Sequence, residues 1–315
     1  MKLHAVVKKY ITHRRLLGES MQTCERILKA FVRSAGQKKN LAQIKADQVN
    51  KFLAGKGSVT TYWHGKHQAL RGFYRYVISR GYAKTSPVPT ATPKRPQCFI
   101  PYIYSTKEVR ILLDACFTYQ KRPGLLEPSA VRTLLLLLYG AGLRIREALR
   151  LTLADVNLDQ GLITIRETKF RKNRLVPLGA QLTEVLLQYA QQRQQQGHSQ
   201  NPEAPFFHYR NGKPIGQHAI ENAFLRIRKH AGIYRSDGAR FQPRLHDFRH
   251  TAAVHRLEMW YRKGADVQRL LPALSVYLGH VCLDATSTYL TMTPMLLREA
   301  GRRFERYAFK EVCHD

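Results

Sequence analysis

The chain has 315 residues, of which 44% are hydrophobic, enough for two domains of ordinary size with buried cores. Its 52 Lys and Arg residues far exceed its 22 Asp and Glu residues, so the formal net charge is +30 at pH 7. Such an excess repels itself unless a polyanion offsets it, which makes nucleic acid the leading candidate partner and an anionic membrane surface a weaker one.

The five cysteines are odd in number, widely spaced and without a Cys-x-x-Cys pair. This pattern argues against a disulfide framework or a zinc finger and fits a reducing cytoplasm. The basic, amphipathic start of the chain lacks the apolar run of a signal peptide, and the most apolar stretch, Leu134–Leu143, is about half the length needed to span a bilayer. We therefore expect a cytoplasmic, nucleoid-associated protein with no membrane role.

The first part of the chain, residues 1–85, is predicted to be a helical and strongly basic domain. Residues 1–97 hold 20 Lys and Arg but 3 Asp and Glu, so the charge is most concentrated here. Apolar residues recur at the spacing of helices, which are predicted over Leu3–Leu17, Met21–Val32, Leu41–Leu53 and about Ser58–Tyr82.

The last of these predicted helices mixes basic and aromatic residues. Phe73 and Tyr76 are three positions apart, which places part of the set in the core. Lys66, Arg71 and Arg75 are predicted to face DNA phosphates, the alternative being a solvated basic face.

Five prolines among residues 86–101 interrupt any helix and predict an extended linker. Residues 102–315 then form a second predicted domain, which opens with a capping box of Ser105 and Glu108. Its predicted helices cover Ser105–Cys116, Ser129–Tyr139, Leu143–Leu151, Gln181–Gln196, His218–Ala231, Asp247–Lys263, Asp266–Tyr277 and Pro294–Glu311.

Between the predicted helices Leu143–Leu151 and Gln181–Gln196, the spacing of apolar residues changes from about 3.6 residues to 2 residues. Gly161–Glu167 and Arg174–Leu178 are predicted strands, and the basic link Thr168–Asn173 joins them as a hairpin. The expected fold class is therefore mostly α with a small antiparallel β-sheet.

Two candidate site segments lie near the start of the second domain. Arg144 follows a glycine-rich turn, where the paired N–H donors of its guanidinium could bind an anion. Glu147 lies on the same helical face and could orient that guanidinium. Alone, this pair is more typical of an exposed ion pair. Lys169 begins the hairpin turn, where a lysine could give a proton to a leaving oxygen, and Arg171 and Lys172 are further predicted DNA contacts.

Two further candidate segments follow. His246 and Arg249 share a helix face and could grip one phosphate. His246 and His250 also have a metal-ligand spacing, but there is no His-Glu-x-x-His motif and no cysteine cluster nearby, so no metal site is predicted. His280 ends a Leu-Gly-His motif, and Tyr289 follows nine residues later. A lone tyrosine becomes a nucleophile only where bases and cations converge on it.

Taken together, these motifs resemble the signature of the tyrosine recombinases, or phage integrases. The order matches: Arg-x-x-Glu after a glycine turn, a hairpin lysine followed by Arg-Leu-Val-Pro-Leu, His-x-x-Arg-His, Leu-Gly-His and a tyrosine. The resemblance covers essentially the whole chain. It implies a helical core-binding domain, an α+β catalytic domain, and an enzyme that cleaves and rejoins DNA at specific sites to integrate, excise or transpose a mobile element.

The resemblance also implies roles for the residues. Tyr289 would form a 3′-phosphotyrosyl bond, Arg144 and Arg249 would bind the phosphate, and Lys169 would be the general acid. His246 would be the base, and His280 would hydrogen-bond the phosphate or the nucleophile. Glu147 would be a supporting residue of the site. Because bond energy is conserved in the phosphotyrosine, no cofactor, metal or ATP is expected.

Family resemblance further implies four protomers on two duplex DNA sites, with the C-terminal helix docked on a neighbour. An apolar stripe suits this, although it could equally pack on its own domain; its residues are Leu296, Leu297, Ala300, Phe304, Tyr307 and Ala308.

Two departures from the family pattern leave the subgroup open. The thirty-one positions from Arg249 to His280 exceed what the commonest members have, and Thr291 stands where many have histidine. A transposon or integrative element is our hypothesis for the element served. The alternatives are a type IB topoisomerase-like enzyme that relaxes DNA, a catalytically silent DNA-binding accessory protein, and a metal-dependent nuclease.

Overall fold

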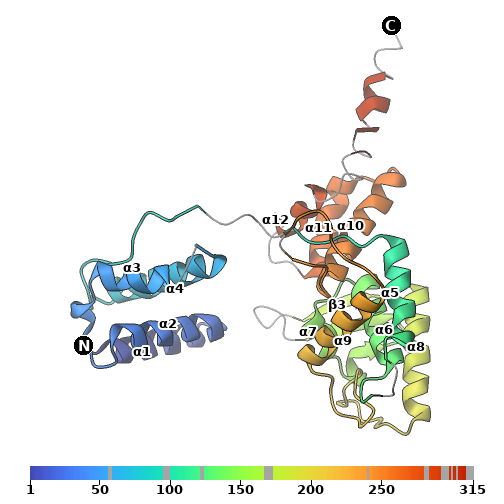
Figure 1. Ribbon diagram of the computed structural model, residues 1–315, viewed down its shortest axis with the longest axis horizontal. Coiled ribbons are helices and arrows are strands. Elements are labelled where there is room, and N and C mark those ends of the chain that lie inside the picture. The colour runs from blue at the N-terminus through green and yellow to red at the C-terminus, as the bar shows by residue number, and fades with distance from the viewer. Residues whose placement is uncertain are drawn as a thin grey trace. The chain divides into compact units, whose positions relative to one another are not determined.

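The computed structural model describes residues 1–55, 59–94, 100–120, 124–166, 173–239, 241–279, 284–291, 298, 301–302 and 304–309. The chain divides into two compact units, Met1–Phe99 and Ile100–Asp315. Figure 1 shows that the first is built from helices and the second from helices and a small sheet. The predicted fold class, mostly α with a small antiparallel sheet, is confirmed.

Each helix of the first unit buries one apolar stripe. In α1, for example, Leu3, Val7, Tyr10 and Ile11 are buried at helical spacing. Figure 1 shows α1 beside α2 and α3 beside α4, and α4 packs against both α1 and α2. The elements are α1 (Leu3–Leu16), α2 (Gln22–Ala35), the 3₁₀ helix η1 (Leu41–Gln43), α3 (Ala46–Ala54) and α4 (Thr61–Ser79).

The prediction of one continuous helix over Leu41–Leu53 is wrong at its centre. Ile44 has an extended backbone that separates η1 from α3. The side chain of Gln43 accepts a hydrogen bond from the backbone N–H of Asn40 at 2.9 Å, and that of Gln48 accepts from the backbone N–H of Lys45 at 3.3 Å. Each glutamine thus satisfies a free N–H at the start of its own helix, so the chain forms two short helices.

The second unit is centred on α6, whose apolar residues are buried on several sides. Ala130, Leu134 and Leu138 are almost fully buried, because α6 packs against α5, α8 and α10. The helices are α5 (Thr106–Thr118), α6 (Pro128–Gly140), α7 (Ile145–Leu149), the 3₁₀ helix η2 (Leu153–Asp155), α8 (Ala180–Gln195), α9 (Gln217–His230), α10 (Asp247–Arg262), α11 (Val267–Leu278), α12 (Asp284–Ser287) and the 3₁₀ helix η3 (Thr288–Thr291).

The small sheet is antiparallel, with strand order β1-β2-β3. The predicted hairpin corresponds to β2 (Leu162–Ile165) and β3 (Arg174–Pro177), in which Ile163 pairs with Val176 and both face the core. The two-residue strand β1 (Val156–Asn157) was not predicted from sequence because it is too short to carry a period. The sheet places Arg174 at the start of β3, directly after the hairpin turn.

Candidate active site

A tight turn between α6 and α7 positions Arg144. Gly142 has a φ of +61°, and a Cβ atom at this position would lie 2.7 Å from Leu278 Cδ2, so glycine is required by both backbone and space. Arg144 precedes the first residue of α7, and its backbone N–H donates to Glu147 Oε2 at 3.0 Å. Its guanidinium Nη1 donates to Glu147 Oε1 at 2.8 Å, while the side chain stays 40% exposed. Arg144 is therefore held firmly at one edge and open to an anion at another.

A second arginine, Arg174, binds the same carboxylate. Its Nη1 and Nη2 donate to Glu147 Oε1 and Oε2 at 3.0 and 2.7 Å. Burial by itself raises the pKa of Glu147, but the hydrogen bonds from Arg174 and from the backbone of Arg144 outweigh it and lower the pKa to about 2. Glu147 is thus an ionised carboxylate between two guanidiniums. The sequence contained the Arg-Leu-Val-Pro-Leu strand but gave no signal that Arg174 reaches α7.

Arg249 is buried at the first turn of α10. Its Nη1 donates to Gly142 O at 2.6 Å and its Nη2 to Leu278 O at 2.5 Å. Burial and then the charge of Arg144 lower the pKa of Arg249 to about 10, so the guanidinium stays protonated at neutral pH. The same glycine turn that positions Arg144 therefore also binds Arg249.

The C-terminal end of α11 binds all three arginines through consecutive backbone carbonyls. Tyr277 O accepts from Arg174 Nε at 3.3 Å, Leu278 O from Arg249 Nη2, and Gly279 O from Arg144 Nη2 at 3.0 Å. Carbonyls in the last turn of a helix carry partial negative charge and favour cations. We call this group of three carbonyls the α11 carbonyl run. It gathers arginines from three separate segments into one cationic site.

Gly279 allows this close approach. It ends α11 with a φ of +68°, and a Cβ atom here would lie 2.7 Å from Arg174 Nη1. The glycine of the Leu-Gly-His motif thus has a steric reason in this chain.

Tyr289 lies in η3 and is buried against α10 and α11. Its ring meets that of His250 edge-on, with centroids 5.6 Å apart. Burial raises the pKa of the Tyr289 hydroxyl above its ordinary value of 10.0, whereas the charge of Arg249, a hydrogen bond with Arg249 and the charge of Arg144 act in the opposite direction. The predicted nucleophile therefore lies beside the two predicted phosphate-binding arginines.

His246 precedes α10 and is exposed. Partial burial of its ring, followed by the charges of Arg249, Arg244 and Arg144, lowers its pKa to about 4. Its ring lies edge-on to that of His250, with centroids 5.1 Å apart. A neutral imidazole at physiological pH can accept a proton, which suits a general base.

Other predicted site residues have different outcomes. Lys169, Arg171, Lys172 and His280 lie outside the described residues. Within the part of the chain that is described, no group of three or more His, Cys, Asp or Glu side chains could hold a metal ion. Over the same residues, no helix combines the length and apolar character needed to cross a membrane.

The prediction that Lys66 faces DNA phosphates is wrong. Lys66 is buried, and its Nζ donates to Phe52 O at 2.5 Å and to Leu53 O at 2.7 Å. Its ammonium thus satisfies carbonyls in the last turn of α3 instead of facing solvent. Arg71 and Arg75, one helical turn apart on α4, are exposed. The error arose because Lys66 is five residues from Arg71 and points to another side of α4.

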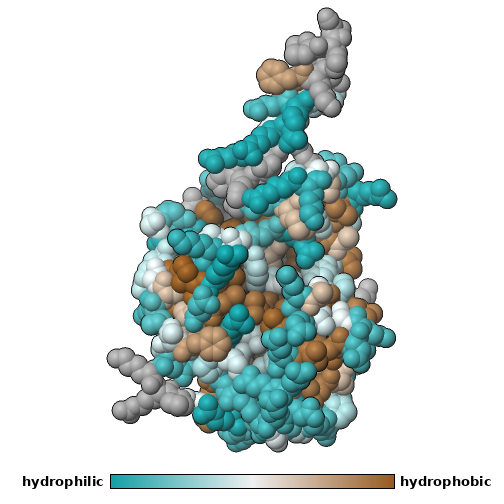
Figure 2. Space-filling model, turned by 90° about the vertical axis from the view of Figure 1, so that its right-hand side faces the viewer, coloured by the Kyte–Doolittle hydropathy of each residue, from teal (hydrophilic) through white to brown (hydrophobic). Residues whose placement is uncertain are grey.

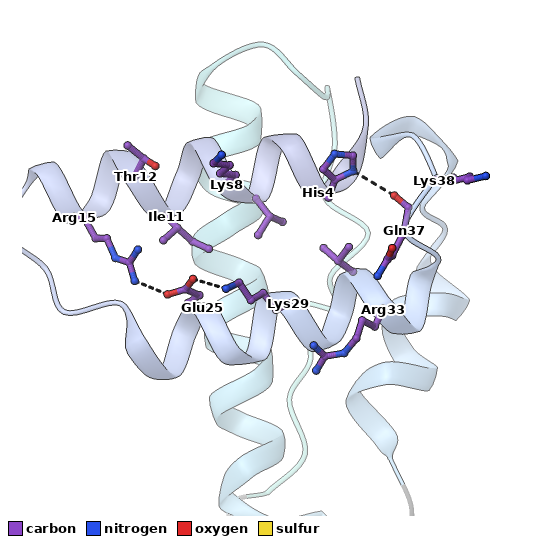
Figure 3. A pocket seen from close by; sticks show the side chains of 12 residues that line it. His4, Lys8, Ile11, Thr12, Arg15, Glu25, Lys29, Arg33, Gln37 and Lys38 are labelled. Atoms are coloured by element: carbon purple, nitrogen blue, oxygen red, sulfur yellow. Dashed lines mark hydrogen bonds and ion pairs between the residues drawn. The ribbon is translucent and has the colours of Figure 1, made fainter.

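A further basic surface was not predicted from the sequence. α1 and α2 border a groove of about 660 Å³ with Val7, Ile11 and Val32 among its lining (Figure 3). Glu25 there pairs with Arg15 and, at 2.8 Å, with Lys29. Other basic residues of the lining form no ion pair with the described residues; they are Lys8, Arg33 and Lys38.

The comparisons with known proteins agree with this fold and site. Residues 105–294 match the phage integrase family. A Sinorhizobium fredii protein, y4rE, named as an integrase/recombinase, is 34% identical over 298 residues and covers 94% of each chain. Tyrosine recombinase XerC of Thermodesulfovibrio yellowstonii is 26% identical over 301 residues, covering 90% of each chain.

Solved structures show the same fold at lower identity. The integrase of transposon Tn1549, in complex with transposon right-end DNA, gives a TM-score of 0.68 at 16% identity, covering 98% of this chain and all of that one. A lambda integrase tetramer bound to a Holliday junction gives a TM-score of 0.63 at 17% identity, and the match covers 92% of this chain and 77% of that one.

The second unit, which contains the clustered arginines, matches the recombinase class in fold and family. The chain belongs to the phage integrase family, the tyrosine recombinases. It is accordingly a site-specific recombinase by family.

Proposed function

We propose that this recombinase cleaves and rejoins duplex DNA through a 3′-phosphotyrosyl bond to Tyr289, in the service of a mobile element. The observation that carries the proposal is the α11 carbonyl run, which holds Arg144 and Arg249 on adjacent carbonyls while Tyr289 lies against Arg249. Two guanidiniums beside a buried hydroxyl suit attack on a phosphodiester, because negative charge builds on the phosphorus oxygens during the reaction.

The proposed reaction is a transesterification. The Tyr289 oxygen forms a bond to phosphorus, and the bond from phosphorus to the 5′ oxygen of the next nucleotide breaks. The tyrosine proton passes to His246, and Lys169 gives a proton to the departing 5′ oxygen. Arg144 and Arg249 bind the non-bridging oxygens of the pentacoordinate phosphorane, and His280 hydrogen-bonds the phosphate or the nucleophile. Reversal with a new 5′ hydroxyl rejoins the strand.

The buried hydroxyl of Tyr289 needs help to lose its proton, since burial raises its pKa. The charge of Arg249 stabilises the phenolate, and the neutral His246 accepts the proton. Each step exchanges one phosphoester bond for another of similar energy, so the proposed reaction consumes no ATP and uses no metal.

Assembly of several copies on paired sites is part of the proposal. Residues 301–302 and 304–309 are helical, and Phe304, Tyr307 and Phe309 are each more than 60% exposed. Figure 2 shows apolar surface on this C-terminal segment among hydrophilic side chains. Large apolar side chains left in water favour docking on another surface. We propose that this segment docks on a neighbouring protomer in a tetramer. Of the other stripe residues, Ala308 is half-buried, and Leu296, Leu297 and Ala300 lie outside the described residues.

Trapping of the covalent intermediate tests the proposal. A nicked duplex from the DNA that flanks the gene, designed so that the cleaved fragment diffuses away, should accumulate protein–DNA adduct. Peptide mapping should place the nucleotide on Tyr289. Supercoil relaxation of unrelated plasmid without recombinant product would favour a topoisomerase, and cleavage lost in EDTA would favour a nuclease. DNA binding without any adduct would indicate an accessory protein.

The pH dependence of cleavage tests the proposed base. Protonated His246 cannot accept the tyrosine proton, so the rate should fall as pH drops through the pKa of this group. That pKa is lowered to about 4 from an ordinary 6.5, and the exposure of His246 to solvent screens part of the shift. We therefore expect the second-order rate constant for adduct formation to hold steady from pH 8 down to roughly 6.5 and to decline between there and about 4.

The variant His246→Gln is the control for this profile. It should react about 10²-fold to 10⁴-fold more slowly, and its rate should no longer decline between pH 6.5 and 4 (the acid limb of the profile). Glu147, whose pKa is lowered to about 2, stays ionised across the window and so contributes no limb. An unchanged limb in His246→Gln would exclude this histidine as the base.

DNA contact by the first unit is proposed for Arg71 and Arg75 of α4, which are exposed one turn apart. Each phosphate contact contributes about 0.9 to the slope of log affinity against log salt. The double variant Arg71→Gln/Arg75→Gln should therefore lower that slope by about 2. The measurement is duplex binding by fluorescence anisotropy across a salt series.

Two further variants serve as controls for this experiment. Lys66→Met should leave the salt slope unchanged and lower the free energy of unfolding by about 1–3 kcal/mol, because the buried carbonyl of Leu53 and the part-buried carbonyl of Phe52 lose their donor. Lys8→Gln/Arg33→Gln alters the groove between α1 and α2. A change of the salt slope in this groove variant, with none in Arg71→Gln/Arg75→Gln, would mean that the groove contacts DNA and that Arg71 and Arg75 do not.

A further inference from the structure

We infer that Arg174 is a positioning residue for the cleavage reaction: through Glu147 it holds Arg144 in place and keeps the positive charge of Arg144 available to the phosphate. The inference deepens the proposed function and rests on it. Arg174 itself faces Glu147 and the end of α11, so its effect on the phosphate passes through other residues.

The contacts of Arg174 make a nearly closed set. Two parallel hydrogen bonds join its guanidinium to the Glu147 carboxylate, and its Nε donates to Tyr277 O. The side chains of Arg174 and Glu147 are 11% and 12% exposed. A bidentate pair of this kind fixes the carboxylate in direction as well as distance. Arg174 thus links β3, α7 and the end of α11.

The net charge beside the phosphate site also depends on Arg174. Glu147 carries one negative charge, and its Oε1 accepts from both Arg144 Nη1 and Arg174 Nη1. With both arginines present the group of three carries a net positive charge, part of it on the exposed side of Arg144. Without Arg174, Glu147 would neutralise Arg144 alone. An Arg144–Glu147 pair of zero net charge would attract a phosphate, and a phosphorane, far less.

The orientation of the Glu147 carboxylate also depends on Arg174. Glu147 Oε2 accepts from the backbone N–H of Arg144 and from Arg174 Nη2, so each carboxylate oxygen accepts from both arginines. Loss of Arg174 would leave lone pairs of a mostly buried carboxylate unsatisfied. Glu147 would then keep only its hydrogen bonds from Arg144, so one residue instead of two would fix the direction of the carboxylate.

The test compares Arg174→Met and Arg174→Lys with a matched control in the same sheet. Arg166 follows β2 and forms a 2.5 Å ion pair with the buried Asp155, so it is a second arginine–carboxylate pair, away from α7 and with a more exposed arginine. Arg174→Met should slow single-turnover adduct formation by about 10-fold to 100-fold, as loss of a supporting partner commonly does. Arg174→Lys should recover part of this loss by restoring charge. Arg166→Met should retain the wild-type rate.

A neutral substrate separates positioning from a general structural defect. A methylphosphonate at the scissile position lacks one charged oxygen, so its reaction depends less on arginine charge. The ratio of wild-type to Arg174→Met rates should shrink at least several-fold on this substrate, whereas misfolding would lower both rates equally. Thermal unfolding curves establish that each variant is folded at the assay temperature.

Each outcome decides the inference. If wild type forms the Tyr289 adduct but Arg174→Met slows it no more than Arg166→Met does, the positioning role is overturned while the proposed function stands. An equal defect on phosphate and methylphosphonate overturns it as well. Failure of wild type to form any adduct would instead overturn the proposed function.

Discussion

We expect Tyr289→Phe to abolish the covalent protein–DNA adduct while duplex affinity stays within about twofold of wild type, since the hydroxyl is proposed to be the attacking atom and contributes little to ground-state binding. The ring of Tyr289 is buried among apolar side chains of α10 and α11, and phenylalanine preserves that packing. Adduct yield on a nicked duplex, measured by denaturing gel, and affinity, measured by anisotropy, report the two effects separately.

Tyr277→Phe is the matched control. Tyr277 is near the end of α11, and its hydroxyl donates to Pro177 O at 3.4 Å, away from Arg249. Removal of this hydroxyl leaves the backbone carbonyl of the α11 carbonyl run intact. We expect adduct yield near the wild-type value. Normal adduct in Tyr289→Phe, or loss of adduct in both variants, would contradict the assignment of the nucleophile.

We expect Arg249→Lys to lower the rate of adduct formation by about 10²-fold to 10³-fold, the scale for loss of one preorganised donor to a developing oxyanion. The two Nη atoms of Arg249 span Gly142 O and Leu278 O, and its charge acts on Tyr289. A lysine has one nitrogen and cannot bridge both carbonyls while facing a phosphate. Single-turnover kinetics at saturating enzyme measure the chemical step.

Arg256→Lys controls for an arginine change on the same helix. Arg256 is exposed on α10 and lies 5.9 Å from the centroid of the Tyr277 ring. Its replacement should leave the rate within about twofold of wild type, as expected for an exposed side chain. Comparable losses in the two variants would mean that α10 is sensitive to any arginine replacement, and the special role of Arg249 would be refuted. Circular dichroism of both variants checks that the buried lysine has not unfolded the unit.

Sequence predictions were correct where the interactions that form an element lie within a few residues of one another. The α5 prediction succeeded because Ser105 and Glu108 form a capping box within one turn. The strongly apolar stretch Ser129–Tyr139 was predicted as a buried helix for a similar local reason, and α6 spans Pro128–Gly140. The single helix over Leu41–Leu53 failed because hydrophobic spacing continues through Ile44, whereas the backbone does not. Side-chain caps ended and restarted the helix at a point that periodicity does not register.

The candidate site shows the same division. Motif order predicted Arg144, His246, Arg249 and Tyr289 as site residues. In the structure the charges of Arg144 and Arg249 act on both His246 and Tyr289. Arg174 was missed, because its partner Glu147 is 27 residues away and no spacing rule connects a strand to a distant helix. Lys66 was misassigned for the converse reason: its exposure was inferred from charge, while the carbonyls that bind it belong to α3.

The sequence by itself determined the family, the fold class and the order of the site residues, since these follow from local periodicity, caps and motifs. Only the tertiary structure decided which cations share a site and which are buried. Three arginines, one directly before α7 and the others in β3 and α10, converge because consecutive carbonyls at the end of α11 accept their hydrogen bonds. That geometry depends on the packing of segments more than 100 residues apart, such as Arg249 on Gly142, and no stretch of sequence contains it.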